Sequence, residues 1–246
     1  MERVSLALMS VPMWGRVVLI ALLFVGIVGG SGRAGATPEP PSGVFTSLGF
    51  TEHTLATPAG ELVYYEAGSG PPLVFLHGIG GGASSWTWSK IAPAFTGDYR
   101  VVVADWVGWG ASEHPARYQL FDDYVGQLDA LLTEIGGPAT LVTQTAAAGF
   151  AAELAESQPD RISGIVFMTP SGGIEFGENV TDPFFAATFT PIASTEGVNR
   201  AFYELVFHRP EFIRFFFTGT GYADPAAVGD DVVEAFTASA QQPNAS

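Results

Sequence analysis

The chain has 246 residues, of which 47% are hydrophobic, and its 25 Asp and Glu against 10 Lys and Arg give a formal net charge of −15. This length and apolar fraction fit one globular domain with a modest appendage. The scarcity of basic residues argues against a nucleic-acid partner, and the absence of cysteine excludes disulfides, thiolate metal sites and a cysteine nucleophile. We expect no metal and no organic cofactor.

The N-terminal region has the pattern of an export signal. Residues 17–30 form an uncharged apolar run after Arg16, and the small residues Ala34 and Ala36 form a cleavage pattern. Because spanning a bilayer takes roughly 20 apolar residues, the run predicts a signal peptide at residues 1–36. The alternative is an uncleaved membrane anchor through residues 17–30. A proline-containing linker is expected at residues 37–45.

The next segment predicts strands. Residues 50–56 and 61–67 alternate and flank a turn, which predicts an antiparallel hairpin at the edge of a sheet. Residues 73–76 and 100–105 are apolar runs typical of strands buried on both faces of a parallel sheet. A helix is expected between them at residues 86–95.

Strands and helices continue to alternate toward residue 173. Residues 122–135 carry apolar side chains at helical spacing, and residues 140–143 form a strand that runs directly into an Ala-rich helix at residues 146–158. A further strand follows at residues 164–168. Repeated alternation predicts an α/β fold with a mainly parallel sheet over residues 46–173.

A glycine-rich loop follows the first buried strand. In the segment His77-Gly78-Ile79-Gly80-Gly81-Gly82, the glycines allow backbone N–H groups to face a pocket, as in one half of an oxyanion hole. The competing interpretation is a flexible turn. We expect His77 to bond nearby loop carbonyls and to have a structural role.

The junction at residues 143–147 predicts a nucleophile elbow. Its sequence, Thr143-Gln144-Thr145-Ala146-Ala147, joins a strand to a helix without a loop, and Thr145 stands where Gly-x-Ser-x-Gly has serine. Thr145 is β-branched, so a strained elbow conformation costs it more than it costs serine.

These motifs together resemble the α/β-hydrolase superfamily. They are the glycine loop, the segment Asp105-x-x-Gly108-x-Gly110-x-Ser112, the elbow, and the segment Thr169-Pro-Ser-Gly-Gly173. The resemblance implies a mostly parallel sheet with a helical cap at residues 174–246. It also implies that Thr145 is the nucleophile, that the N–H groups of Ile79 and Ala146 hold the oxyanion, and that His77, Gly78 and Gly80 support the loop.

The expected cap is rich in aromatic residues, which could line an apolar substrate pocket or simply attach the cap to the core. Asp224 and Pro225 predict a helix start, with the helix running to about residue 240. The aromatic residues noted are Phe184, Phe185, Phe189, Phe202, Tyr203, Phe207, Phe212, Phe215, Phe216 and Phe217.

The family plan places an acid and a histidine after strands seven and eight, and neither strand is predicted here. His208 is the only histidine downstream of the elbow, and we expect it on the surface or within cap packing rather than acting as a base. The chain is therefore expected to be a truncated reading of a longer gene, with an apolar sheet edge left open.

Three hypotheses follow. The first is an exported hydrolase of esters or similar apolar small molecules. The second is a related protein that binds an apolar ligand without turning it over, because Thr145 replaces serine and no triad histidine is found. The third is a membrane-anchored scaffold that docks partners on the open sheet edge. The oligomeric state is left open.

Overall fold

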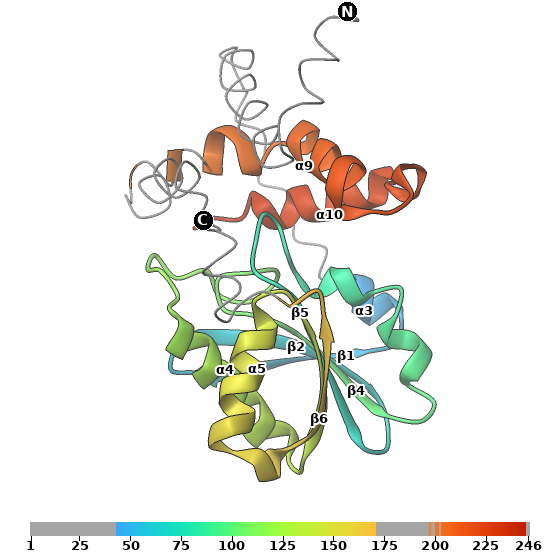
Figure 1. Ribbon diagram of the computed structural model, residues 1–246, viewed down its shortest axis with the longest axis vertical. Coiled ribbons are helices and arrows are strands. Elements are labelled where there is room, and N and C mark those ends of the chain that lie inside the picture. Colours follow the sequence, from blue (N-terminus) through green and yellow to red (C-terminus); the bar gives the residue numbers. More distant parts are fainter. Residues whose placement is uncertain (1–42, 171–196, 198–199, 202, 245–246) are drawn as a thin grey trace, which may run out of the picture.

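The computed structural model describes residues 43–170, 197, 200–201 and 203–244, and Figure 1 shows a sheet-based core beneath a set of helices. The predicted signal peptide at residues 1–36, most of the predicted linker and the aromatics at positions 184, 185, 189 and 202 lie outside the described residues. In the part of the chain that is described, no helix is long and apolar enough to cross a bilayer.

Six strands form one sheet in the order β1-β2-β4-β3-β5-β6. The pairings of β1 with β2 and of β2 with β4 are antiparallel, and the remaining pairings are parallel. The prediction of a mainly parallel sheet with an antiparallel edge hairpin is confirmed. The strands are β1 (Thr51–Thr57), β2 (Gly60–Gly68), β3 (Pro72–Leu76), β4 (Arg100–Asp105), β5 (Ala139–Gln144) and β6 (Ile162–Met168).

Helical segments cover both faces of the sheet (Figure 1). On one face, α4 (Phe121–Ile135) and α5 (Ala147–Ser157) bury apolar side chains against the sheet, among them Leu128 and Leu154. On the other face, α3 (Gly43–Ser47) and the connection containing Trp88 cover a second cluster. Because successive strand residues point to opposite faces, the fully apolar strands supply both clusters.

The predicted helix at residues 86–95 is wrong. This segment forms two short 3₁₀ turns, η1 (Ser85–Trp88) and η2 (Ala92–Phe95), joined by a turn at residues 89–91. Pro93 lacks a backbone N–H and stands near the start of the second turn, so a continuous α-helix would lose a hydrogen bond there. Trp88 is nonetheless buried against the sheet, so the connection still covers the face that a helix would cover.

The helices above the core come from residues 203–240. They are the π-helical turns η4 (Tyr203–Phe207) and η5 (Phe217–Gly221), α9 (Pro210–Phe216), the 3₁₀ turn η6 (Pro225–Ala227) and α10 (Asp230–Ala240). The expected helix from about residue 226 is therefore shorter than predicted. Asp224 accepts a hydrogen bond from the Ala226 N–H but caps only the 3₁₀ turn, and α10 begins after Gly229.

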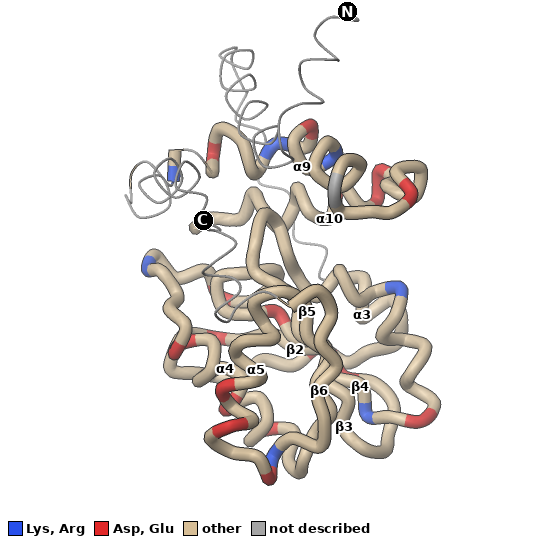
Figure 2. Tube along the Cα trace, viewed as in Figure 1, with Lys and Arg blue, Asp and Glu red and all other residues tan. Residues whose placement is uncertain are grey.

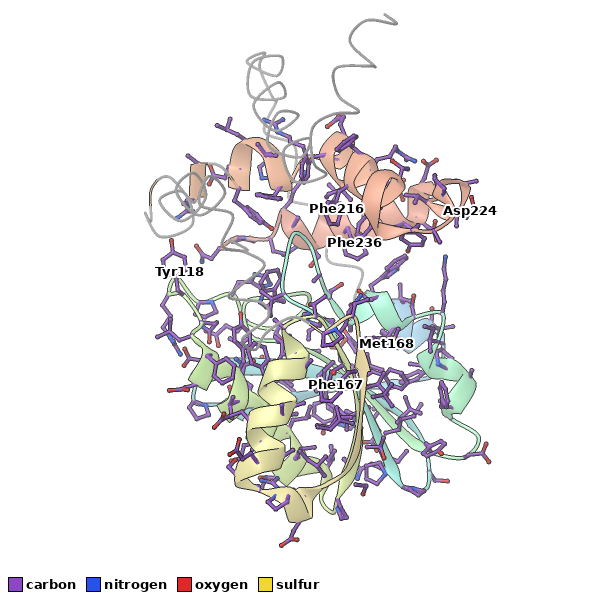
Figure 3. All side chains as sticks on the ribbon, viewed as in Figure 1. Tyr118, Phe167, Met168, Phe216, Asp224 and Phe236 are labelled. Atoms are coloured by element: carbon purple, nitrogen blue, oxygen red, sulfur yellow. The ribbon has the colours of Figure 1, made fainter. Side chains whose placement is uncertain are left out.

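Strand β6 is the last strand of the sheet among the described residues, and several of its large apolar side chains are exposed to solvent. Val166 and Phe167 are 49% exposed and Met168 is 38% exposed. Figure 3 shows Phe167 and Met168 along this strand.

Lys and Arg are few and scattered over the described surface, while Asp and Glu are more frequent (Figure 2).

Asp105 joins two loops at the end of β4. Its buried carboxylate accepts hydrogen bonds from the Ser85 N–H at 2.5 Å and from the Ala111 N–H at 3.0 Å. Burial raises the pKa of Asp105, and these two N–H donors oppose that rise. The buried carboxylate thus satisfies one buried and one partly buried backbone N–H group.

Replacing Asp105 with alanine should therefore destabilise the core. We expect Asp105→Ala to lower the free energy of unfolding by about 2–4 kcal/mol, because it leaves the buried Ser85 N–H and the partly buried Ala111 N–H without acceptors. Urea unfolding followed by circular dichroism measures this loss. Asp98→Asn, at an exposed position, is the control, and a loss no larger for Asp105→Ala than for this control would contradict the assigned role.

Candidate active site

Thr145 lies between β5 and α5 with a left-handed backbone. Its φ is +48°, in a region that β-branched residues rarely occupy, and this costs roughly 1–3 kcal/mol. The turn is held by hydrogen bonds from the Thr145 N–H to the Met168 carbonyl at 3.2 Å and from the Ala148 N–H to the Thr145 carbonyl at 3.1 Å. The residue is thus presented at the carboxyl end of the parallel strands.

The surroundings show how threonine is accommodated at positions 143 and 145. Thr143 is fully buried, and its hydroxyl donates a hydrogen bond to the Val166 carbonyl at 3.3 Å. Gly78 faces Thr145 so closely that a Cβ on this glycine would lie 2.1 Å from the Thr145 Oγ1 atom. The absence of a side chain at Gly78 therefore makes room for the Thr145 hydroxyl.

The two predicted oxyanion donors belong to the two segments that meet at this hydroxyl. Ile79 follows Gly78 in the loop after β3, and Ala146 follows Thr145 at the start of α5. In the described part of the protein, neither backbone N–H donates a hydrogen bond to another protein group. Both groups are thus available to a ligand, and their role as oxyanion donors stays a prediction.

His77 is fully buried and holds two backbone segments together. Its Nδ1 atom lies 2.7 Å from the Gly78 carbonyl, and its Nε2 atom accepts a hydrogen bond from the Trp106 N–H at 3.2 Å. This pairing places the proton on Nδ1, so the ring is neutral. Burial lowers the pKa of His77 to about 4. Both nitrogens are engaged with the backbone, as expected for a structural residue.

A cavity of about 320 Å³ opens beside Thr145 and Gln144. Its floor comes from the glycine loop, and the helices above the core supply most of its other walls. Figure 3 shows Phe216 of α9 and Phe236 of α10 among the helices above the core, with Phe236 on the side nearer the core. The aromatic and aliphatic residues of these helices that line the cavity are Phe207, Phe212, Ile213, Phe216, Phe217 and Phe236.

The aromatic rings above the cavity contact one another in sequence. Phe236 packs edge-on against Trp86 of the core at 6.0 Å and against Phe217 at 4.5 Å between ring centroids. Phe216 and Phe212 extend the series. No described residue that lines the cavity carries a charge. Such a surface favours a neutral, apolar ligand with a few polar atoms near Thr145.

All four histidines of the sequence are described, and none hydrogen bonds to the Thr145 hydroxyl, which is buried without a partner among the described residues. His208 lies in the turn after η4, where its carbonyl accepts a hydrogen bond from the Gln241 side chain at 3.1 Å and its ring meets the edge of Tyr203. Within the described chain, no group of three or more His, Cys, Asp or Glu side chains could hold a metal ion.

Phe236 and the contact beneath it are not apparent from the sequence alone. A Cβ on Gly82 would lie only 2.0 Å from the Phe236 carbonyl oxygen, and Gly82 has a φ of +78°. The available signal is the run of glycines at positions 80–82, which indicates close backbone approach as well as flexibility. Which helix approaches the loop is set by tertiary packing.

Comparison with known proteins finds a family whose model matches this architecture. The family model described as alpha/beta hydrolase fold matches residues 71–204, more than half of the chain. The match begins just before β3 and includes the glycine loop, Asp105 and Thr145.

Two curated relatives match the chain over a shorter stretch. A 2-hydroxymuconate semialdehyde hydrolase from Pseudomonas sp. (strain CF600) is 36% identical over 118 residues, covering 46% of this chain and 40% of the relative. A haloalkane dehalogenase from Mesorhizobium japonicum (strain LMG 29417 / CECT 9101 / MAFF 303099) is 37% identical over 107 residues, covering 43% of this chain and 34% of the relative. The matches thus span well under half of the relatives' lengths.

Solved structures with similar folds are more distant in sequence. An epoxide hydrolase has a TM-score of 0.65 at 20% identity, covering 80% of this chain and 70% of its own. A meta-cleavage product hydrolase from Pseudomonas fluorescens IP01 has a TM-score of 0.62 at 22% identity, covering 78% and 64% of the two chains. These likenesses show a shared fold.

The buried neutral His77 predicts a specific dependence of stability on pH. With its pKa lowered from about 6.5 when unfolded to about 4 when folded, the unfolded chain binds a proton first as the pH falls. His77 should therefore contribute stability that is present above pH 6.5 and lost as the pH falls to 4. We expect this loss to reach about 3 kcal/mol by urea unfolding at a series of pH values.

The matched variant is His77→Gln, which cannot titrate in this range. Its unfolding free energy should be lower at pH 7 and should change less between pH 6.5 and 4 than that of the wild type. Asp105 lies 3.7 Å from the His77 ring and is present in both proteins, so the difference between the two curves isolates His77. Parallel curves would show that His77 does not titrate as stated.

Proposed function

Because the chain belongs to the α/β-hydrolase fold family, we propose that it hydrolyses esters or similarly activated derivatives of apolar small molecules, with Thr145 as the nucleophile. One observation carries the proposal. Thr145 is held in a left-handed turn at the end of β5, beside a cavity whose described lining is uncharged and largely aromatic. A strained residue facing a pocket is typical of functional sites.

In this reaction the Thr145 hydroxyl oxygen attacks the carbonyl carbon of the ester. The Ile79 and Ala146 N–H groups then donate hydrogen bonds to the oxyanion that forms. One such donor lowers the barrier by roughly 3–4 kcal/mol, since it is already oriented toward the developing charge. A base must accept the hydroxyl proton and pass it to the alcohol oxygen as the C–O bond of the substrate ester breaks and the alcohol leaves. Water then hydrolyses the acyl ester on Thr145, which releases the acid and restores the hydroxyl.

The residue at the elbow also separates the reaction types found among similar proteins. By resemblance, haloalkane dehalogenases and epoxide hydrolases use an aspartate at this position, and a carboxylate nucleophile forms an ester with the substrate carbon. This chain has Thr145 there, and a hydroxyl nucleophile suits acyl transfer. This difference supports an ester-type substrate over an epoxide or a haloalkane.

A second candidate function is the binding of an apolar ligand without turnover. The specific observation in its favour is that none of the four histidines hydrogen bonds to the Thr145 hydroxyl among the described residues. The cavity and the two unpaired N–H groups would bind a carbonyl-containing ligand equally well without a base. The two candidates therefore share a site and differ in chemistry.

We further propose export of the protein, based on the apolar run at residues 17–30 and the cleavage pattern ending at Ala36. The alternative within this proposal is retention of the run as a membrane anchor. In either case residues 46–246 would lie outside the cytoplasm.

Thr145 variants test the proposed chemistry. We expect Thr145→Ala to lower the hydrolysis of p-nitrophenyl butyrate by about tenfold or more, because the nucleophilic oxygen is removed while the cavity stays. Thr145→Ser keeps the oxygen and removes the methyl group, so it should hydrolyse the ester at least as fast as the wild type. Initial rates measured on the 246-residue chain test both expectations.

A fluorophosphonate probe provides a second readout of the same residue. Mass spectrometry should locate the adduct on Thr145 in the wild type and find none in Thr145→Ala. If the wild-type chain neither hydrolyses the ester nor forms an adduct, yet binds the ester, the second candidate function holds. Unfolding curves for each variant ensure that a lost rate is not a lost fold.

Export makes its own prediction. When the full chain is produced in an exporting bacterial host, Edman sequencing of the mature protein should begin at Thr37. Replacing Ala36 with a bulky residue, as in Ala36→Leu, should block this cleavage and leave the longer form. A protein that keeps residues 1–36 and stays in the membrane fraction would favour the anchor.

A further inference from the structure

Phe236 of α10 forms the wall of the cavity that faces Trp86. It is one of the residues that line the cavity, and its ring meets the Trp86 ring edge-on at 6.0 Å between centroids. Trp86 itself is not among the described residues that line the cavity. The Phe236 ring, which lies on the side nearer the core in Figure 3, therefore separates the space beside Thr145 from the tryptophan behind it.

The backbone that carries this ring is packed against the glycine loop. A Cβ on Gly82 would lie 2.0 Å from the Phe236 carbonyl oxygen and 3.1 Å from the Phe236 Cα atom. The helix and the loop are thus in contact at this point, and α10 cannot move closer to the loop without a clash. The wall has a fixed position on this side.

Two further contacts hold α10 to the core, one near each end of the helix. Near its start, the Lys90 ammonium lies 3.4 Å from the Asp231 carboxylate, and near its end the Ser239 hydroxyl donates a hydrogen bond to the Ala83 carbonyl at 3.4 Å. The exposed ion pair adds little stability, but it restrains the helix together with the hydrogen bond. Phe236 lies between these two contacts.

The opposite side of the cavity is more open. Phe216 of α9 also lines the cavity, and it is 42% exposed to solvent. Phe236 instead has the Phe217 ring at 4.5 Å and the Trp86 ring behind it. The cavity of about 320 Å³ is at the lower end of the range of ligand pockets, about 300–1,000 Å³, so one fixed wall has a large effect on what fits.

We propose that Phe236 is a specificity-determining residue, whose ring limits the length of the apolar chain that a neutral carbonyl ligand can place in the cavity. The ligand is neutral because no described residue of the lining carries a charge. The inference rests on the proposed function, since it takes the cavity beside Thr145 as the substrate site. It adds a substrate class to that function, namely esters with short apolar chains.

The first test measures binding without turnover. Straight-chain 2-alkanones are neutral, present one carbonyl and one apolar chain, and cannot be hydrolysed. Isothermal titration calorimetry should show affinity rising about fourfold for each added CH₂ until a limiting chain length is reached. Phe236→Ala removes the aromatic ring, so we expect it to extend that limit by about three CH₂ groups.

Phe215→Ala is the matched control for this test. It makes the same substitution on α9, at a side chain that is 37% exposed and outside the described lining, and it should keep the wild-type limit. Phe236→Leu keeps an apolar side chain and should extend the limit by less than Phe236→Ala. Because each limit compares ligands within one protein, it does not depend on the fraction of protein that is folded.

Three results of the binding test would overturn the inference. They are an equal limit in the wild type and Phe236→Ala, an equal extension in Phe215→Ala, and a wild type that binds none of the alkanones. Each would show that something other than the Phe236 ring sets the size of the ligand.

The second test uses esters. In a wild type that hydrolyses p-nitrophenyl butyrate, Phe236→Ala should raise the ratio of kcat/KM for the octanoate to kcat/KM for the butyrate by about tenfold or more, because the added CH₂ groups gain a place in the cavity. Phe215→Ala should leave this ratio unchanged. An unchanged ratio in Phe236→Ala would reject the assigned role.

Failure of the inference and failure of the proposed function give different results. A wild type without ester hydrolysis would reject Thr145 as a nucleophile, and the alkanone limits would still decide the role of Phe236. Conversely, hydrolysis that depends on Thr145, with the same chain-length preference in Phe236→Ala as in the wild type, would retain the function and reject the inference.

Discussion

The left-handed turn at Thr145 is the constraint on which the site depends. With a φ of +48°, it lets the chain pass from β5 to α5 without a loop, so the Thr145 side chain is carried at the end of the strand. A β-branched residue pays more strain in this conformation than serine would. The compensation is distributed among neighbours: Gly78 leaves space for the hydroxyl, Thr143 is satisfied by the Val166 carbonyl, and the Met168 carbonyl accepts the Thr145 N–H.

Close approaches on two sides explain why the loop after β3 is built from glycine. It must approach the elbow at Gly78 and the backbone of α10 at Gly82, and both approaches are too close for a Cβ. His77 and Asp105 hold the base of this arrangement from within the core, since each bonds backbone groups of two different segments. Buried polar residues thus act here as fixed connections between loops.

The sequence was informative where local pattern and tertiary structure agree. Apolar runs and turn residues located all six strands, and the strand-to-helix junction located Thr145. It misled where a single residue overrides the pattern, as Pro93 does in the connection that forms two 3₁₀ turns, and where Gly229 delays the start of α10. The contacts of Gly82 with α10 and of Tyr203 with Ala240 join residues far apart in the chain, and spacing alone carries no information about such pairs.

Three energetically unfavourable features occur together at one cavity, and their occurrence together is the argument for a functional site. The backbone of Thr145 is strained, its hydroxyl is buried without a partner among the described residues, and two nearby N–H groups are left unpaired there. Each would be removed by a simple substitution or a small shift if packing alone were at stake. A carbonyl-containing ligand would satisfy the N–H groups and meet the hydroxyl at its carbon, while the phenylalanine rings of α9 and α10 would cover its apolar part. Binding needs nothing more, whereas turnover also needs a proton acceptor within reach of the Thr145 hydroxyl, and this requirement separates the two candidate functions.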